Sequence, residues 1–363
     1  MSEWKEYTIG EICSRFSSGK SIKASQISAE GLYPVYGGNG LRGFTDTFNF
    51  DGECSIIGRQ GAYCGNVRYF KGKAFMTEHA IVAVVNENHN NGYVSNLLSM
   101  MNLAQYQGQS AQPGLSVSTL SKITIKLPDL ATQEQCFNVL NLIDQKIQIN
   151  NQINRELESM AKTLYDYWFV QFDFPDQNGK PYKSSGGKMV YHPELKREIP
   201  EGWGVEKIEN IAQTGSGGTP KSTNVSYYSN GEIPWINSGE LEQTVITSTS
   251  NFITEEGLNN SSAKLFPSGT ILVAMYGATA GKVSFLTFEA STNQAICAIT
   301  LTDIRMRYYL KNVIEDLYQY LVKLSTGSAR DNLSQDMIKN IKVVIPSNDI
   351  LDRFYDFSNN IIK

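Results

Sequence analysis

The sequence predicts an α+β protein made of two tandem-repeated domains of short strands and helices, separated by a long helix that forms a coiled coil. Sequence blocks recur along the chain, a stretch of 40 residues without Gly or Pro separates them, and Gly-rich turns bound short apolar runs in both copies. At 363 residues the chain is long enough for two domains and their connections.

The motif GAxxGxV occurs twice, from Gly61 to Val67 and from Gly277 to Val283. The offset between matched residues changes only from about 199 to about 218, so a whole domain is duplicated rather than a short repeat. Two similar domains indicate two similar tasks. The other matches are Trp4, Ile9, Ile12 and Gly19 with Trp203, Ile208, Ile211 and Gly218; Thr77, Ala80, Ile81 and Ala83 with Thr292, Ala295, Ile296 and Ala298; and Leu115, Ser116, Ile123 and Pro128 with Leu333, Ser334, Ile341 and Pro346.

The first domain is expected at residues 1–129 and the second at residues 203–347. Apolar runs predict strands, and intervening amphipathic stretches predict helices. The strands are expected at 55–58, 80–85, 270–275 and 295–301, and the helices at 94–106 and 308–324.

A spacer helix is predicted between the two copies, over residues 130–170. Thr132 and Gln135 form a candidate capping box after Pro128, and a helix of about 38 residues would be about 57 Å long. Apolar residues follow the 3-4 spacing of a coiled-coil seam, and buried asparagines on such a seam fix its register and partner. An ordinary core helix with a solvated Asn-rich face is the alternative. The seam comprises Leu140, Ile143, Ile147, Asn150, Asn154, Leu157, Ala161, Leu164 and Trp168.

Residues 171–202 are rich in Pro, Gly, Ser and Lys, and this composition predicts a linker. Residues 348–363 are expected to begin a second spacer helix, with Phe354, Phe357 and Ile361 at helical spacing. This helix is less than half as long as the first, which is consistent with either a natural truncation or an incomplete reading frame.

Composition excludes several classes of protein. The N-terminus is polar and charged, and no apolar run approaches the roughly 18 residues of a membrane span, so a cytoplasmic protein is expected. The five cysteines are scattered without a CxxC spacing, which argues against a disulfide framework or a zinc site. Net charge is −4, so any contact with DNA depends on local clusters of basic residues.

Four segments stand out beside the internal duplication: residues 33–40 (YPVYGGNG), 58–65 (GRQGAYCG), 164–175 (LYDYWFVQFDFP) and the segment from 172 to 203. Together with the duplication, they resemble the specificity (S) subunit of type I restriction-modification systems. The resemblance covers essentially the whole chain. It implies two target-recognition domains, each of which recognises one half of a bipartite DNA target, and spacer helices that pack as an antiparallel coiled coil. The short C-terminal helix departs from this pattern.

The resemblance also implies partners and cofactors. The helices would set the gap between the half-sites and dock two methyltransferase (M) subunits, and restriction (R) subunits would join that core. S-adenosylmethionine, ATP and Mg are expected in the partner subunits, with no cofactor and no metal in this chain. The implied partners are double-stranded DNA and these subunits, without a membrane.

The residues themselves favour recognition over catalysis. His79 matches Gln294 in the second copy, so the copies share no His-based mechanism, and an adenine methyltransferase motif [ND]PP[YF] is absent. GSGGTPKS at 215–222 resembles a P-loop, but Pro220 cannot donate an N–H to phosphate. Pro175-Asp176 with Glu194-Leu195-Lys196 has the letters of a nuclease motif, but both pairs lie in the predicted linker. No catalytic residue is therefore expected.

Polar and basic residues on the Gly-rich loops are the candidates for DNA contact. Arg can recognise guanine and Gln can recognise adenine in the major groove, while Lys contacts phosphates. The candidates in the first copy are Lys20, Lys23, Arg42, Arg59, Gln60 and Tyr63, and those in the second are Lys221, Asn237, Tyr276, Lys282, Arg330 and Asn332.

Two other functions remain open. The chain could be the specificity polypeptide of another multisubunit DNA modification enzyme. It could also be a coiled-coil structural adaptor that does not read DNA. The target sequence is not inferable, because recognition also depends on loop conformation, bound water and DNA deformability.

Overall fold

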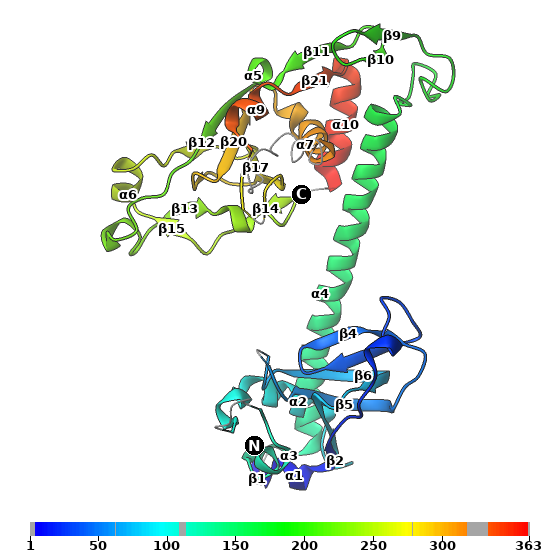
Figure 1. Cartoon of the computed structure of the whole chain (residues 1–363), viewed down its shortest axis with the longest axis vertical. Coiled ribbons are helices and arrows are strands. Elements are labelled where there is room, and N and C mark those ends of the chain that lie inside the picture. Colours follow the sequence, from blue (N-terminus) through cyan, green and yellow to red (C-terminus); the bar gives the residue numbers. More distant parts are fainter. Residues whose placement is uncertain (1–3, 62, 109–113, 278, 318–332, 362–363) are drawn as a thin grey trace. The chain divides into compact units, whose positions relative to one another are not determined.

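A computed structural model describes residues 4–61, 63–108, 114–277, 279–317 and 333–361. The chain forms two compact units, Met1–Asn150 and Asn151–Lys363. Each unit combines helices with sheets, which confirms the predicted α+β class (Figure 1). The boundary falls inside the long helix α4 (Leu130–Tyr165), whose first turns pack in the first unit and whose last turns pack in the second.

The first unit is built on one six-stranded sheet with the strand order β2-β7-β5-β6-β3-β4. β3 pairs parallel with β6, and the other neighbours are antiparallel. A separate ladder joins β1 to β8, close to the two ends of the domain. The elements are β1 (Lys5–Thr8), α1 (Ile9–Ile12), β2 (Cys13–Ser18), β3 (Tyr33–Gly37), β4 (Gly40–Thr45), β5 (Phe50–Gly58), β6 (Val67–Met76), β7 (Ala80–Val85), α2 (Asn91–Met100), η2 (Leu103–Tyr106), α3 (Val117–Leu120) and β8 (Thr124–Leu127).

Both faces of this sheet are buried at its centre. Ile57 and Ile81 pack against the helices, while Ile56 and Val82 pack on the opposite face. The predicted helix at 94–106 differs in detail, because α2 ends at Met100 and a short 3-10 helix follows. Asn102 has a left-handed φ of 45°, which ends the α-helical hydrogen bonding there.

The second unit repeats this arrangement with shorter strands. One sheet has the order β12-β20-β17-β18-β14, a second has β15-β13-β19-β16, and β11 pairs with β21. Residues 318–324 of the predicted helix 308–324 lie outside the described residues. The elements are β9 (Met189–His192), β10 (Arg197–Pro200), β11 (Gly204–Lys207), α5 (Ile208–Ile211), β12 (Ala212–Ser216), β13 (Ile233–Ile236), β14 (Val245–Ile246), β15 (Phe252–Ile253), α6 (Glu255–Asn259), β16 (Leu265–Phe266), β17 (Ile271–Ala274), β18 (Val283–Leu286), β19 (Ala290–Thr292), β20 (Ile296–Leu301), α7 (Arg307–Asp316), α9 (Gln335–Lys339), β21 (Lys342–Ile345) and α10 (Asn348–Ile361).

Strand pairing shows that the two units share one topology. The order β2-β7-β5-β6 in the first unit corresponds to β12-β20-β17-β18 in the second. The antiparallel ladder β1–β8 corresponds to β11–β21, and the parallel pair β3–β6 corresponds to β13–β19. The repeated sequence blocks therefore mark a duplicated domain.

One part of the sequence match is wrong by one residue. Gly58 and Ala274 are equivalent in the GAxxGxV blocks, and they pair with Ala80 and Ile296 respectively. Ala80 therefore corresponds to Ile296 and not to Ala295.

The same shift applies to neighbouring positions. Ile81 corresponds to Cys297, since each lies in the core cluster on the helix-covered face of its own unit. Ile296 lies on the opposite face of its sheet. A shift of one residue in a strand moves every side chain to the other face of the sheet. The residues matched by identity in the two sequences are therefore not at equivalent positions in this strand. Gly19 likewise corresponds to Gly217, because each would place a Cβ against the carbonyl of a neighbouring strand.

The long helix is present as predicted, but its N-terminus is capped differently. Asp129 accepts a hydrogen bond from the Thr132 amide at 2.8 Å, so Asp129 caps the helix instead of the predicted box of Thr132 and Gln135. A single π-helical turn, Asp166–Val170, extends α4 at its C-terminus.

The predicted seam divides into two parts. Leu140, Ile143 and Ile147 are 45, 50 and 52% exposed, and Asn150 and Asn154 are exposed as well. In the second unit Ala161 and Trp168 are buried and Leu164 packs beside them, so this part of the seam contributes to the unit's own core. Leu157 is partly exposed.

Residues 171–202 connect the long helix to the second copy and are themselves folded. Phe172 and Phe174 are buried in an aromatic cluster with Trp203, and the strands β9 and β10 form a hairpin. Asp173 accepts hydrogen bonds from the amide and hydroxyl of Ser184 at 2.7 and 2.6 Å, which lowers the pKa of its carboxyl group. The composition of the segment indicates loops but does not indicate these anchors.

The C-terminal helix α10 packs antiparallel to the end of α4 within the second unit. The ring of Phe354 lies 4.9 Å from that of Phe169 and 6.1 Å from that of Trp168, while Ile361 lines a hollow with Asn154. The buried face of α10 contains Ile350, Leu351, Phe354 and Ser358, and Phe357 is only partly buried. The helix expected over these residues is therefore present, and Phe357 lies at the edge of its buried face.

Cys54, Cys64 and Cys297 are buried and contribute to packing, whereas Cys136 is exposed. All five are free thiols, and burial raises the pKa of Cys54 and Cys297 to about 12, so these two stay protonated at neutral pH. None of the described helices combines the length and the apolar content that crossing a membrane requires.

Replacing Phe354 by Ala should lower the free energy of unfolding by about 3–5 kcal/mol, because this ring is fully buried between α4 and α10. Replacing the exposed Asp356 on the same helix should change it by less than about 0.5 kcal/mol. Chemical denaturation of both variants measures the difference. Equal stabilities would show that the cluster does not hold α10.

Candidate nucleic-acid interface

Four loops of the first unit meet at one end of its sheet. A Cβ placed at Gly38, in the β3–β4 turn, would lie 3.0 Å from the carbonyl oxygen of His79 and 3.1 Å from that of Gln60. Arg59 donates a hydrogen bond to the hydroxyl of Ser18 at 3.4 Å. The end of β2, the β3–β4 turn, the β5–β6 loop and the β6–β7 turn are therefore contiguous.

The β5–β6 loop carries the repeated motif, and its backbone is fixed from several sides. Gly61 and Gly65 have left-handed φ values of 82° and 87°, which explains why glycine stands at these positions. The carbonyl of Arg59 accepts from the Leu115 amide at 2.9 Å and from the Cys64 thiol at 3.1 Å. Burial raises the pKa of that thiol, so it remains a donor at neutral pH. These hydrogen bonds and left-handed glycines thus hold the backbone of Arg59, Cys64 and Gly65 in place.

The second unit has the same frame. Gly277 and Gly281 have left-handed φ values of 89° and 79°, and Leu333 donates its amide to the carbonyl of Met275. The duplicated motif is therefore a duplicated loop geometry.

The loops of the first unit carry a local positive charge. Residues 18–23, 37–42, 59–66 and 77–79 contain four Lys or Arg side chains and one carboxylate, that of Glu78. Three of the four basic residues are exposed, and Arg59 is partly buried. The basic residues are Lys20, Lys23, Arg42 and Arg59.

Two glycines allow arginines to lie flat against the β3–β4 turn. The side chain of Arg42 would lie 2.7 Å from a Cβ at Gly37, and the guanidinium of Arg68 would lie 2.9 Å from a Cβ at Gly40. Arg68 is exposed and was missed by the sequence analysis because it stands within the alternating pattern of β6. Its position three residues after Gly65, directly beyond the repeated loop, was the available signal.

The remaining candidates of the first unit also lie on these loops. Gln60 is exposed, and its side-chain oxygen is 3.1 Å from Nδ1 of His79. Tyr63 is 48% exposed on the β5–β6 loop. The structure thus brings Arg42, Arg59, Gln60 and Tyr63 to one end of the sheet.

Two candidates of the second unit are hydrogen-bonded to the adjacent residues Asn293 and Gln294. The hydroxyl of Tyr276 donates to the carbonyl of Gln294 at 2.9 Å, and the side-chain oxygen of Asn237 accepts from Asn293 at 3.4 Å. Lys221 is exposed on the loop after β12. Lys282 lines a separate hollow with Glu242 and Glu315. The candidates Arg330 and Asn332 lie outside the described residues.

Polar residues that the sequence analysis did not select lie beside these candidates. The hydroxyl of Thr219 donates to the side-chain oxygen of the exposed Gln294, and the indole N–H of Trp235 donates to the carbonyl of Gly218 at 3.0 Å. The residue of the second unit that is equivalent to His79 is Ala295 and not Gln294. The carbonyl of His79 accepts from the Arg59 amide, and the carbonyl of Ala295 accepts from the equivalent Met275 amide. Strand register, which single-letter matching cannot fix, would have revealed this.

The P-loop-like stretch and the nuclease-like letters have other roles in the local structure. The amide of Gly218, in the P-loop-like stretch, donates to the carbonyl of Thr292 at 2.9 Å and is not available to a phosphate. Asp176 accepts from the amides of Asn178 and Lys180 in a tight turn, whereas Glu194 pairs with Lys342 at 3.2 Å. Within the residues that the structure describes, His, Cys, Asp and Glu side chains form no group of three that could hold a metal ion.

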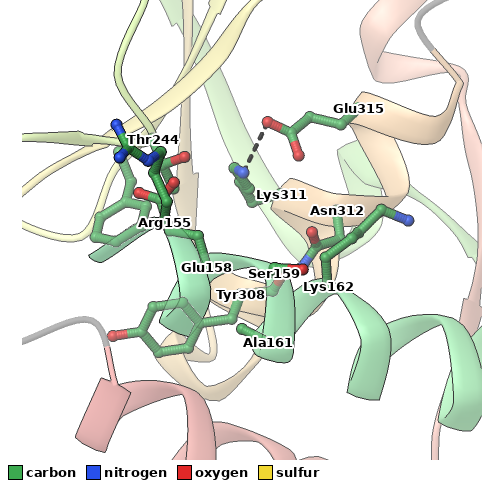
Figure 2. Close-up of a pocket in the computed structure, with 11 residues that line it drawn as sticks. Arg155, Glu158, Ser159, Ala161, Lys162, Thr244, Tyr308, Lys311, Asn312 and Glu315 are labelled. Atoms are coloured by element: carbon green, nitrogen blue, oxygen red, sulfur yellow. Dashed lines mark hydrogen bonds and ion pairs between the residues drawn. The ribbon is translucent and has the colours of Figure 1, made fainter. Parts of the chain in front are cut away.

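A hollow of about 350 Å³ in the second unit lies between the end of α4 and α7 (Figure 2). Lys311, which is 8% exposed, pairs with Glu315 at 2.7 Å, and Lys162 pairs with Asp316 at 3.0 Å. The Lys162–Asp316 pair joins the end of α4 to α7, whereas the Lys311–Glu315 pair lies within α7.

Comparison with known proteins follows the duplication. The family model described as the type I restriction modification DNA specificity domain matches residues 1–159 and 200–363. The chain therefore belongs to this family.

Individual relatives agree with the family match. The chain is 37% identical over 164 residues to the type I restriction enzyme EcoprrI specificity subunit of Escherichia coli, covering 44% of this chain and 41% of the relative. It is 27% identical over 256 residues to the MjaIX specificity subunit of Methanocaldococcus jannaschii, covering 70% of this chain and 57% of the relative. The chain thus spans about half the length of these curated relatives.

A solved structure shows the same fold. The S subunit of a type I restriction-modification system from M. genitalium is 15% identical, has a TM-score of 0.65, and matches over 99% of this chain and 90% of that one. At this identity the likeness establishes the fold alone.

Substitution of the loop glycines should separate the requirement for a left-handed φ from the requirement for space. Gly61→Ala should lower the free energy of unfolding by about 1–2 kcal/mol, which is the cost of a left-handed φ alone. No atom lies within 4 Å of the added Cβ, so no steric clash adds to it. Gly65→Ala should cost about 3–5 kcal/mol, since its Cβ would lie 2.4 Å from the backbone nitrogen of Ala104. Denaturant titration compares the two variants, and a larger cost at Gly61 would contradict the described loop.

Proposed function

We propose that this chain is a DNA sequence-recognition subunit of a type I restriction-modification complex, in which each unit reads one half of a bipartite target. The observation that carries this proposal is that the family match covers both copies of the domain, each with the same pair of left-handed glycines beside a β-sheet. Two similar DNA-recognition domains on one chain fit a target with two half-sites.

Positive charge and side-chain chemistry suggest a division of roles in the first unit. Lys20 and Lys23 are exposed and suit phosphate contacts, which position a protein without reading sequence. Arg42, Arg59 and Gln60 lie on fixed loops and suit base edges in the major groove, where Arg recognises guanine and Gln recognises adenine. Arg68 joins this set because its guanidinium lies against Gly40.

The second unit would read a different half-site. Its equivalent loops present Asn237, Tyr276 and Lys221 and carry fewer basic side chains than those of the first unit. Arg330 and Asn332 remain candidates for the same surface. Because the side chains at equivalent positions differ, the two half-sites should differ in sequence.

Spacer helices would set the gap between the half-sites and dock two M subunits. The exposed apolar side chains Leu140, Ile143 and Ile147, together with Asn150 and Asn154, suit a helical partner that covers this face of α4. Leu157 lies next along the seam, while Leu164 and Trp168 would stabilise the helix from within the second unit.

The chain itself is proposed to be non-catalytic. S-adenosylmethionine, ATP and Mg would belong to the M and R subunits, and the complex would act on DNA in the cytoplasm. The proposed division of the chain is residues 1–129 and 203–347 for recognition, 130–170 and 348–363 for spacing, and 171–202 for connection.

Exchanging residues 1–128 for the equivalent domain of another family member should change one half of the bound motif and leave the other half intact. The motif is measured by selecting randomised DNA duplexes with the full chain, together with any methyltransferase subunits that co-purify, and sequencing the bound pool. A swap that altered both halves would contradict modular reading. A wild-type protein that selects no motif would favour a structural adaptor.

Arg59→Ala should lower specific binding by about 1–3 kcal/mol and relax preference at one base pair, if the guanidinium contacts a base edge. Competition with single-mismatch duplexes at fixed salt measures this effect. The matched control is Lys71→Ala on β6, whose side chain is 71% exposed and pairs with Glu53. A uniform loss over all duplexes with a flatter salt dependence would assign Arg59 to phosphate, and wild-type affinity throughout would remove it from the interface.

A further inference from the structure

The side chain of Gln60 contacts His79, a residue to which no role has yet been assigned. Its oxygen lies 3.1 Å from Nδ1 of His79. The other ring nitrogen, Nε2, lies 3.5 Å from a carboxylate oxygen of Glu78. The imidazole therefore stands between the amide of Gln60 and the carboxylate of Glu78.

Hydrogen-bond chemistry fixes the direction of this contact. A carbonyl oxygen only accepts hydrogen bonds, so with this orientation of the amide the contact assigns the proton to Nδ1 of His79, which donates to Gln60. The amide nitrogen of Gln60 then remains a donor, and its oxygen keeps one lone pair.

The backbone that carries this pair is itself fixed. The carbonyl of His79 accepts from the Arg59 amide at 3.0 Å, and Gly38 packs against the carbonyls of His79 and Gln60. Residues Gln60 and Gly114 form an isolated antiparallel bridge. The remaining freedom of Gln60 lies in its three side-chain torsions, and His79 restricts them.

We propose that His79 is a positioning residue that fixes the amide of Gln60 for bidentate recognition of an adenine in the major groove. This role rests on the proposed DNA-reading function. The amide nitrogen donates to adenine N7, and the free lone pair of the oxygen accepts from the N6 amino group. Without the imidazole, the long side chain of Gln60 samples several rotamers, and only some of them match the base edge.

The second unit lacks this arrangement. Tyr276 occupies the position of Gln60, Ala295 occupies the position of His79, and the Tyr276 hydroxyl is engaged by the carbonyl of Gln294. The adenine preference should therefore belong to the half-site of the first unit, and the other half-site serves as an internal control.

The test uses the full chain and a pool of randomised duplexes at one salt concentration, with sequencing of the bound fraction. Gln60→Ala should lower the preference for adenine at one position by about 5- to 150-fold. His79→Leu should lower it at the same position. His79→Asn should restore it, because the side-chain nitrogen of Asn lies near the place of Nδ1, whereas His79→Gln places its nitrogen near Nε2 and should behave like the Leu variant.

Specific outcomes would overturn the inference. One is full adenine preference in the His79→Leu variant, and another is a His79→Asn variant that is no better than His79→Gln. If the Leu variant does not fold, the comparison of Asn with Gln carries the test, and an unchanged second half-site shows that each variant is folded. A wild-type chain that selects no motif would overturn the proposed function and this inference together, whereas a normal wild-type motif with an unchanged His79→Leu motif overturns the inference alone.

Discussion

The second unit depends on one aromatic cluster, in which the end of α4, residues 172–203 and α10 are packed together. Phe169 contacts Tyr309, Trp203 and Phe354, and the ring of Phe174 stacks on that of Trp203 at 4.9 Å. Stacked and edge-on aromatic pairs combine large buried area with a preferred geometry, so they fix direction as well as stability. This cluster ends the long helix and turns the chain into the second domain.

The turn at the end of the helix requires an unusual backbone conformation. Phe172 has a left-handed φ of 64°, a conformation that usually selects glycine. The amide of Asp173 donates to the carbonyl of Tyr167 at 2.8 Å and so closes the helix end. Burial of the Phe172 ring against Trp203 offsets the backbone strain, which is of order 1–3 kcal/mol. A glycine would allow the turn but would remove the anchor.

In each candidate interface, by contrast with Phe172, glycines adopt the left-handed φ values and neighbouring residues provide the polar side chains. The left-handed glycines of the β5–β6 and β17–β18 loops set the same frame in both units. The side chains on that frame differ, since Gln60 in one unit is replaced by Tyr276 in the other. Because backbone geometry and side-chain chemistry are separable, one frame shared by both units and carrying different side chains would suit the proposed recognition of two different half-sites.

The sequence by itself determined the duplication, the α+β class, the long helix and the loops that carry the candidate residues, because these features are local patterns of apolar spacing and glycine placement. Tertiary structure alone decided the one-residue register between Ile81 and Cys297, the place of Arg68 and the contact of His79 with Gln60. Strand register and side-chain contacts between loops arise from pairing of residues distant in sequence, and no local pattern encodes them. The aromatic anchors of residues 171–202 were missed for the same reason, since burial depends on the partner that the fold supplies.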